Sequence, residues 1–132
     1  MDMLLEVVFV PVSDVGKSKD FYEKRVGFKA DFQFGENGRA DGPPQLVQLT
    51  PPGSNCSIHI GKGIVDMKPG TIKSLILVVD SAQAAKKELE SRDVEVGDIQ
   101  ELPWGKQADF ADPDGNSWTL QESYARNKQK EK

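Results

Sequence analysis

The sequence predicts an α+β domain built from two modules of the same βαβββ order. The order of one strand, one helix and three strands can be traced twice along the chain. The marker Val-x-Asp at 12–14 recurs at 78–80, an offset of 66 residues. The chain has 132 residues, 37% of them hydrophobic, which is enough for one core, whereas a module of about 60 residues has little core alone. We therefore expect one domain over residues 1–125, with modules at about 4–60 and 71–122 and a basic tail at 126–132.

The first module begins with a near-continuous β-branched run over residues 4–12, typical of a strand covered on both faces. Ser13-Asp14 then offers an N-cap for a short helix over 17–26, which Gly27 ends. Alternating aromatic residues predict a half-buried strand over 28–34. The remaining elements expected in this module are a turn-rich loop at 35–44 and strands at 45–50 and 56–60.

The second module repeats this order. Residues 71–79 form another β-prone run, and Asp80-Ser81 caps a helix over 82–92. Val94, Val96 and Ile99 predict the next strand. The module is expected to end in a hairpin with strands at 107–111 and 116–121 across the turn ADPDG.

Composition and charge exclude several classes of protein. The formal net charge is −4, and because the tail RNKQKEK carries four bases and one acid, the remaining body carries −7. An acidic body argues against nucleic-acid binding and favours neutral or cationic ligands. The longest apolar run, 75–79, is far too short to span a bilayer, and the N-terminus does not resemble a signal peptide. The single cysteine, Cys56, excludes an internal disulfide framework, so we expect a cytoplasmic protein.

Three segments in this order and spacing carry a family resemblance: PVSDVGKSKDFYEKRVGF, LVQLTPPGS and FADPDGNSWTLQE. With them the chain resembles the vicinal oxygen chelate superfamily over about residues 4–122. This superfamily includes glyoxalase I, bleomycin resistance proteins, extradiol dioxygenases and fosfomycin-resistance enzymes. The resemblance implies paired βαβββ modules whose mixed sheets curl around a cup, usually in a homodimer that completes the walls of the cup.

The resemblance also implies where a metal would bind, and there the sequence departs from the family. Family enzymes hold a divalent metal in the cup with four side chains, typically His and Glu, which lets the cation polarise two substrate oxygens. Valine has no donor atom, and amide or hydroxyl oxygens are weak neutral ligands for a dication. We therefore expect no metal cofactor at the usual positions. The corresponding residues are Val7, Gln48, Ser74 and Thr119.

The same positions suit the binding of an uncharged or cationic small molecule. Gln48, Ser74 and Thr119 are neutral polar groups on an otherwise apolar cup, which suits oriented hydrogen bonding to a ligand. The alternative is that they are satisfied polar residues in a filled core with no ligand. The other residues expected to line the cup are Val7 and Phe9 on the first strand, Trp104 as a flat wall and Gln121 at the rim. Alternatively, Trp104 anchors its loop onto the core.

His59 is the one histidine of the chain and the candidate catalytic residue. Alternation with Ile58 and Ile60 points it away from their side of the strand. Whether it faces the cup beside Gln48 stays open at this point, because the turn PPGSN allows two registers that differ by one residue. His59 is expected to act as a general acid or base, or to hydrogen-bond a ligand. The alternative is a strand residue satisfied by a neighbour or by water.

Three functions follow from these residues. The leading hypothesis is a metal-independent protein that reversibly binds a small, largely apolar molecule, such as an antibiotic or metabolite, and resembles bleomycin resistance proteins. The alternative is a glyoxalase- or dioxygenase-like lyase, isomerase or oxygenase with a relocated metal, or with metal-independent chemistry at His59. Glu101, Asp109 or Glu122 would assist His59 if the loops bring them inward. The third is an accessory subunit with a filled cup. No nucleic-acid or membrane partner is expected.

Overall fold

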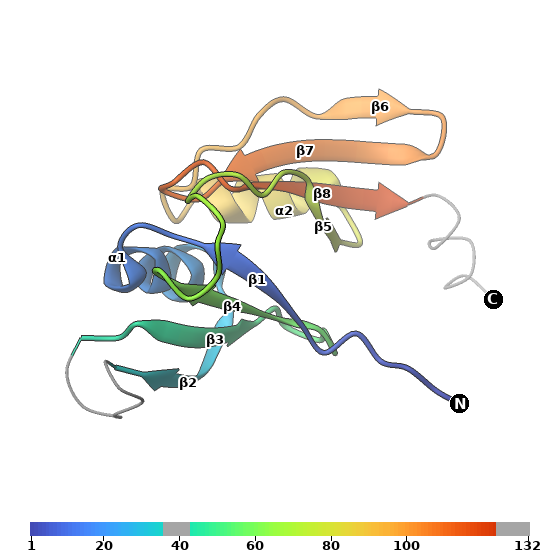
Figure 1. The fold of residues 1–132 in the computed structure, drawn as a ribbon. Coiled ribbons are helices and arrows are strands. Elements are labelled where there is room, and N and C mark those ends of the chain that lie inside the picture. The colour runs from blue at the N-terminus through green and yellow to red at the C-terminus, as the bar shows by residue number, and fades with distance from the viewer. Residues whose placement is uncertain (36–42, 124–132) are drawn as a thin grey trace.

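The chain folds as two four-stranded sheets with their helices, and the predicted α+β class is confirmed (Figure 1). The structure is a computed structural model that describes residues 1–35 and 43–123. The first sheet has the strand order β1-β4-β3-β2 and the second has β5-β8-β7-β6. In each sheet the first and last strands of the module run parallel, and the other neighbours are antiparallel. The predicted order of one strand, one helix and three strands therefore occurs twice.

The first module forms its helix where the sequence placed the caps. Asp14 is the N-cap, and its side chain accepts a hydrogen bond from the Lys17 amide at 3.1 Å. Gly27 ends the helix in the left-handed conformation, with φ at 99°. The elements are β1 (Val7–Pro11), α1 (Val15–Asp20), the π-helical continuation η1 (Phe21–Val26), β2 (Lys29–Phe34), β3 (Leu46–Thr50) and β4 (Ser57–Gly61).

The second module has the same plan with a regular helix. Ser81 is the N-cap of that helix, and its hydroxyl accepts a hydrogen bond from the Ala84 amide at 3.1 Å. The elements are β5 (Leu75–Val78), α2 (Ala82–Glu90), β6 (Gln100–Leu102), β7 (Gly105–Ala111) and β8 (Ser117–Ser123).

Three strand predictions were wrong, two in the residue at which the strand begins and one in placing a strand at all. The first strand begins at Val7, not at residue 4, and β5 begins at Leu75, not at residue 71. Ser74, directly before β5, has φ at 60°, which breaks the extended run. Residues 94–99 are not a strand. Val94 and Val96 belong to a loop and their side chains are buried in the core, so their alternation reflects burial and not pairing with a neighbouring strand. Most of the loop predicted at 35–44, and the whole tail at 126–132, lie outside the described residues.

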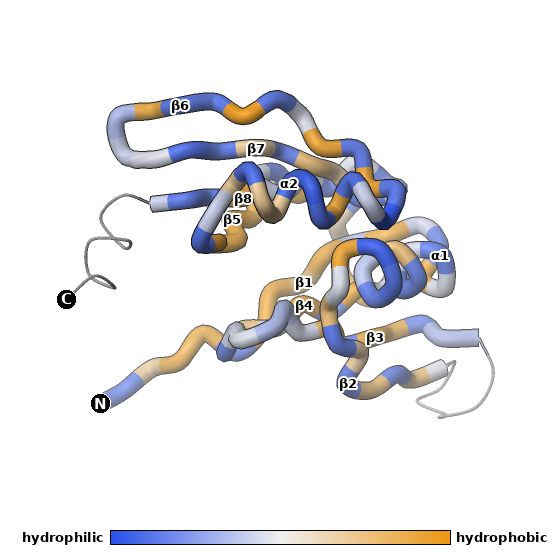
Figure 2. Tube along the Cα trace, turned by 180° about the vertical axis from the view of Figure 1, so that it is seen from behind, coloured by the Kyte–Doolittle hydropathy of each residue, from blue (hydrophilic) through white to orange (hydrophobic). Residues whose placement is uncertain are grey.

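One buried cluster joins the two modules on the helix-bearing side of both sheets. The hydrophobic stretch of β1 runs through the middle of the molecule (Figure 2). The Tyr22 hydroxyl donates to Asp112 Oδ2 at 2.8 Å and accepts from Trp118 Nε1 at 2.9 Å, so a polar contact ties the first module to the second. Members of the cluster include Val10, Val12, Val47, Leu49, Ile58, Ile60, Phe110 and Leu120. Each sheet therefore uses its helix-bearing face within the chain and turns its other face away.

No helix of residues 1–35 and 43–123 combines the length and the apolar character that crossing a membrane requires.

Candidate functional site

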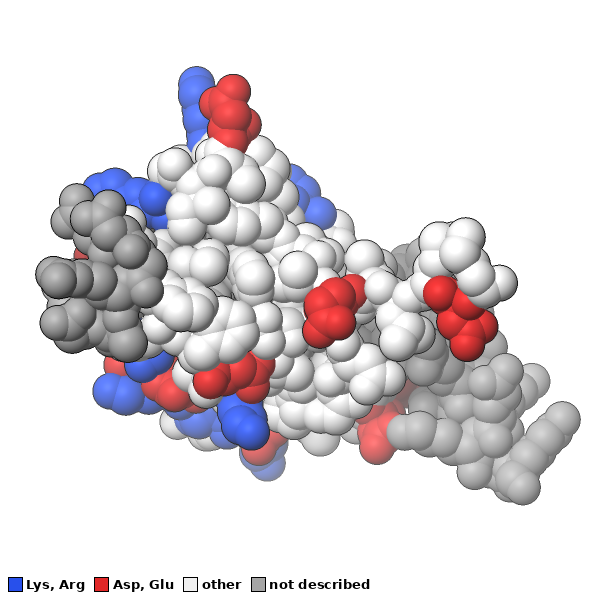
Figure 3. Space-filling model, turned by 60° about the horizontal axis from the view of Figure 1, so that its bottom comes forward, with Lys and Arg blue, Asp and Glu red and all other residues white. Residues whose placement is uncertain are grey.

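The candidate site lies on the faces of the sheets opposite the buried cluster, which we call the first and second outer faces. On the first outer face, His59 on β4 lies between Phe9 on β1 and Gln48 on β3, because both pair with it in register. The Phe32 ring on β2 meets the His59 ring edge-on at 5.9 Å between centroids, and the Phe34 ring lies beside that of Phe32 at 5.4 Å. Each of the two phenylalanines is 41% exposed. The side of the molecule seen in Figure 3 is largely uncharged, with isolated acidic residues and with Lys and Arg toward its edges.

A chain of hydrogen bonds runs through the first outer face. The carboxylate of Asp31 accepts hydrogen bonds from the Thr50 hydroxyl and from Gln48 Nε2, the latter at 3.1 Å. The Gln48 Oε1 atom lies 2.8 Å from His59 Nε2. The bonds from Thr50 and Gln48 lower the pKa of Asp31 below its ordinary value, and burial lowers the pKa of His59. At neutral pH the chain therefore runs from a charged carboxylate to a neutral imidazole.

The second outer face carries a similar arrangement on β7 and β8. The Thr119 hydroxyl donates to Asp109 Oδ1 at 2.8 Å, and the Ser74 hydroxyl lies 3.3 Å from Thr119 Oγ1. Two apolar side chains of the edge strand β5 are open to solvent on this sheet, Ile76 at 59% exposed and Val78 at 50%. Gln121 lies on the same side of β8 as Thr119 and accepts a hydrogen bond from Gln107. Both outer faces thus combine a satisfied polar centre with exposed apolar groups.

The structure brings the predicted ligand-binding residues together in two groups. Val7, Phe9, Gln48 and His59 lie on the first outer face, and Ser74, Thr119 and Gln121 belong to the second. Within one chain these faces point away from each other, because the sheets share their helix-bearing sides (Figure 1). Trp104 lies apart in the turn between β6 and β7 and is 57% exposed, so it does not anchor that turn in the core.

Asp31 is a residue of the site that sequence reasoning missed. By strict alternation it would point away from Phe32 and toward the core. A β-bulge between Ala30 and Phe32 leaves Asp31 opposite no residue of β3 and turns its carboxylate toward Gln48 and Thr50. The sequence gives no sign of a bulge there, since no glycine interrupts the strand.

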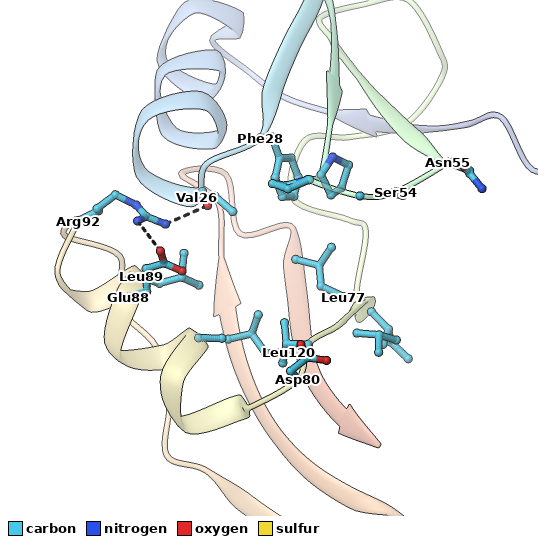
Figure 4. A pocket seen from close by; sticks show the side chains of 17 residues that line it. Val26, Phe28, Ser54, Asn55, Leu77, Asp80, Glu88, Leu89, Arg92 and Leu120 are labelled. Carbon is cyan, nitrogen blue, oxygen red and sulfur yellow. Dashed lines mark hydrogen bonds and ion pairs between the residues drawn. The ribbon is translucent and has the colours of Figure 1, made fainter. Parts of the chain in front are cut away.

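A cavity of about 880 Å³ lies in a crevice between the modules, on their helix-bearing sides (Figure 4). Phe28 and the turn before β4 form one wall, and Leu77, Leu89 and Leu120 form the other. At the rim, Arg92 donates to the Val26 carbonyl at 3.3 Å and forms an ion pair with Glu88 at 3.4 Å. None of the residues predicted to bind a ligand lines this crevice.

Over residues 1–35 and 43–123, no three His, Cys, Asp or Glu side chains are grouped so as to hold a metal ion. At the positions where the family resemblance implies metal ligands, Gln48 uses both amide atoms in hydrogen bonds and Thr119 donates its hydroxyl proton to Asp109.

Several solved structures have the same fold as this chain. The chain is 36% identical to an antibiotic binding protein, TnmS3 from Streptomyces sp. CB03234, with a TM-score of 0.80, covering 92% of this chain and 97% of that one. It is 37% identical to a glyoxalase/bleomycin resistance protein from the same organism, with a TM-score of 0.75 and coverage of 89% and 99%. A bleomycin-binding protein from Streptomyces verticillus, solved with copper(II)-bleomycin, has the same fold at 18% identity, with a TM-score of 0.68 and coverage of 91% and 96%. No curated protein matched the sequence.

The family comparison covers most of the chain. The model of the Glyoxalase/Bleomycin resistance protein/Dioxygenase superfamily matches residues 4–120, nearly the whole of both modules. The chain therefore belongs to the Glyoxalase/Bleomycin resistance protein/Dioxygenase superfamily, as its sequence motifs indicated.

Proposed function

We propose that this protein reversibly binds a small, largely apolar molecule in a cup formed by the outer faces of its sheets. The observation that carries the proposal is the exposed aromatic surface of Phe32 and Phe34 around the neutral pair Gln48–His59. Such a surface buries apolar ligand area, while a few oriented polar groups fix the ligand. The likeness to TnmS3, an antibiotic binding protein, supports an antibiotic or related metabolite as the ligand. A filled cup fits less well, because these aromatic rings are open to solvent.

The cup is completed by a second copy of the chain. In one chain the two outer faces point in different directions, so neither can close over a ligand from both sides. Ile76 and Val78 on the second outer face are exposed apolar groups that a partner would cover. We therefore propose a homodimer in which the first outer face of one copy meets the second outer face of the other. Sedimentation equilibrium should give the dimer mass, and Ile76→Lys should shift the protein to monomer.

The binding that we propose is independent of metal. Val7, Gln48, Ser74 and Thr119 do not fit a divalent cation, because they offer no carboxylate or imidazole and two of them are committed to other hydrogen bonds. Elemental mass spectrometry of the purified protein, before and after reloading with Zn, Ni, Mn and Fe, tests this point. Less than a tenth of an equivalent per chain is expected after washing, and stoichiometric retention would contradict it.

The place of binding is tested by a pair of variants. Phe32→Ser removes an apolar wall of the first outer face, whereas Ala85→Ser adds a hydroxyl to α2 at the crevice. Burial of a phenylalanine side chain contributes about 1.5–3 kcal/mol, so Phe32→Ser should weaken binding by about tenfold or more. Isothermal titration with bleomycin and a panel of apolar antibiotics measures this. If Ala85→Ser weakens binding and Phe32→Ser does not, the ligand occupies the crevice.

A second candidate function is catalysis at His59, which the resemblance to glyoxalases and dioxygenases suggests. The observation in its favour is an imidazole whose pKa is lowered by burial, which makes it a neutral base at pH 7. With a true substrate, His59→Ala would abolish turnover and leave binding within a few-fold of wild type. A binding protein would instead show no turnover of any bound compound.

A further inference from the structure

We propose that Asp31 acts through Gln48 to hold His59 as the Nε2–H tautomer, so that the bare Nδ1 atom accepts a hydrogen bond from the ligand. The ligand class that follows is an apolar molecule with an O–H or N–H donor, such as a phenol or an amide. The ligand part of this inference rests on the proposed function, whereas the tautomer is a property of the protein alone. Asp31 is a positioning residue in this account, and His59 is the residue that contacts the ligand.

The direction of the hydrogen bonds is set by the carboxylate. An ionised Asp31 can only accept hydrogen bonds, so the Gln48 atom 3.1 Å from it must be the amide nitrogen. The other end of the same amide, Oε1, then faces His59. An amide oxygen can only accept, so the proton between Gln48 and His59 lies on His59 Nε2. A neutral imidazole carries one proton, which leaves a lone pair on Nδ1.

Two further contacts agree with this direction. The Thr50 hydroxyl donates its single proton to Asp31, so the Ser57 hydroxyl, 2.6 Å from Thr50 Oγ1, must donate to Thr50. The bulge in β2 places the Asp31 carboxylate where two series of hydrogen bonds end, one from His59 through Gln48 and one from Ser57 through Thr50. Among the described residues of this network, Asp31 is the ionised group. It is linked to His59 through Gln48.

The surroundings of His59 define the rest of the ligand class. The Phe32 ring lies edge-on to the imidazole, and Phe9 pairs with His59 across β1 and β4. Apolar surface thus flanks the imidazole on two sides. A ligand whose only polar group on this side is an acceptor would leave Nδ1 without a hydrogen bond once buried, which is unfavourable.

The tautomer can be measured directly, because His59 is the one histidine of the chain. The ¹⁵N resonances of its ring distinguish a protonated from an unprotonated nitrogen at each position. In wild-type protein at pH 7.5, Nε2 is expected to be protonated and Nδ1 bare. Asp31→Asn removes the obligate acceptor and lets Gln48 turn, so the ratio of Nε2–H to Nδ1–H tautomer should fall by about threefold or more. Asp98→Asn, the same change at an exposed site on the second module, is the matched control and should leave the ratio unchanged.

Two outcomes overturn the tautomer assignment: an Nδ1–H imidazole in wild-type protein, or the same ratio in Asp31→Asn as in wild type. The ligand class is tested with 2-naphthol and its methyl ether, 2-methoxynaphthalene. Only 2-naphthol is expected to shift the Nδ1 resonance, and equal shifts, or none with 2-naphthol, contradict the donor requirement. The tautomer is measured without ligand. The tautomer assignment can therefore be refuted although an antibiotic binds, and it can hold although no antibiotic binds.

Discussion

Removal of the Tyr22 hydroxyl should destabilise the whole protein, because this group lies where the two modules meet. Tyr22 is 0% exposed and Trp118 is 3% exposed, so water cannot replace the lost contacts. Phenylalanine at this position keeps the packing against Phe28 and Trp118 and loses only the two hydrogen bonds. Burial raises the pKa of Tyr22 well above its ordinary value, so the hydroxyl is a donor throughout the physiological range.

The magnitude follows from the two contacts. The bond to the Asp112 carboxylate contributes about 1.5–3 kcal/mol, and a buried Trp118 N–H without a partner costs about 1–3 kcal/mol. Asp112 keeps hydrogen bonds from the Asn116 side chain and from the Asp114 and Asn116 amides, which offsets part of the loss. We therefore expect Tyr22→Phe to lower the free energy of unfolding by about 3 kcal/mol.

Equilibrium unfolding in urea, followed by circular dichroism, measures this change. Because a dimer gains apparent stability with concentration, wild type and variant are compared at one protein concentration. Tyr22→Phe combined with Asp112→Asn should give a coupling energy of about 1–3 kcal/mol. A loss below about 1 kcal/mol for Tyr22→Phe, or additivity of the two changes, would refute a polar junction between the modules. Asp98→Asn, at an exposed site, serves as the control for the second substitution.

Further predictions concern a turn, a titration and the Asp31 carboxylate. Gly70 has φ at 84°, and a Cβ there would lie 2.2 Å from the Asp114 carbonyl oxygen, whereas Gly53 has φ at 78° and open space. Urea unfolding should show a loss of about 1–2 kcal/mol for Gly53→Ala and a larger loss for Gly70→Ala; equal losses would contradict the contact. The ring protons of His59 should titrate below the ordinary value of about 6.5, because burial lowers its pKa. Because the pKa of His59 is lower in the folded than in the unfolded protein, the free energy of unfolding declines as the pH falls below about 6.5. Well above that pH, His59 does not affect it. A midpoint above 6.5 would exclude this effect. The pKa of Asp31, read from its carboxyl ¹³C shift, should lie below its ordinary value and rise in Thr50→Val, since the Thr50 hydroxyl is the main cause of the lowering.

Most of the fold could be predicted because local signals and burial agree. The caps Asp14, Ser81 and Gly27 mark helix ends by their own chemistry, and the recurring order of elements shows the two modules. The prediction failed where residues are buried without belonging to a strand. Val94 and Val96 are the example, because their side chains lie in the core but their backbone does not pair in a sheet.

The site was harder to predict, because it depends on register and on the shape of the sheets. Alternation set His59 opposite to Ile58 and Ile60, but the pairing of His59 with Gln48 depends on the register across the turn PPGSN, which the structure gives. Asp31 was not predictable, because a bulge reverses the side of the strand on which it lies. The division of the expected cup between two outer faces also depends on which sides of the sheets pack together, which no local pattern shows.

We propose above all that the outer faces bind a small apolar molecule without a metal. Equilibrium dialysis of chelator-treated protein against a defined panel of antibiotics, bleomycin included, tests it most directly, with mass spectrometry counting the compound retained per chain. Saturable retention of at least one compound at one equivalent per chain is expected, lost in Phe32→Ser and kept in Ala85→Ser. Retention that appears only after metal is added, or none across the panel, would contradict it.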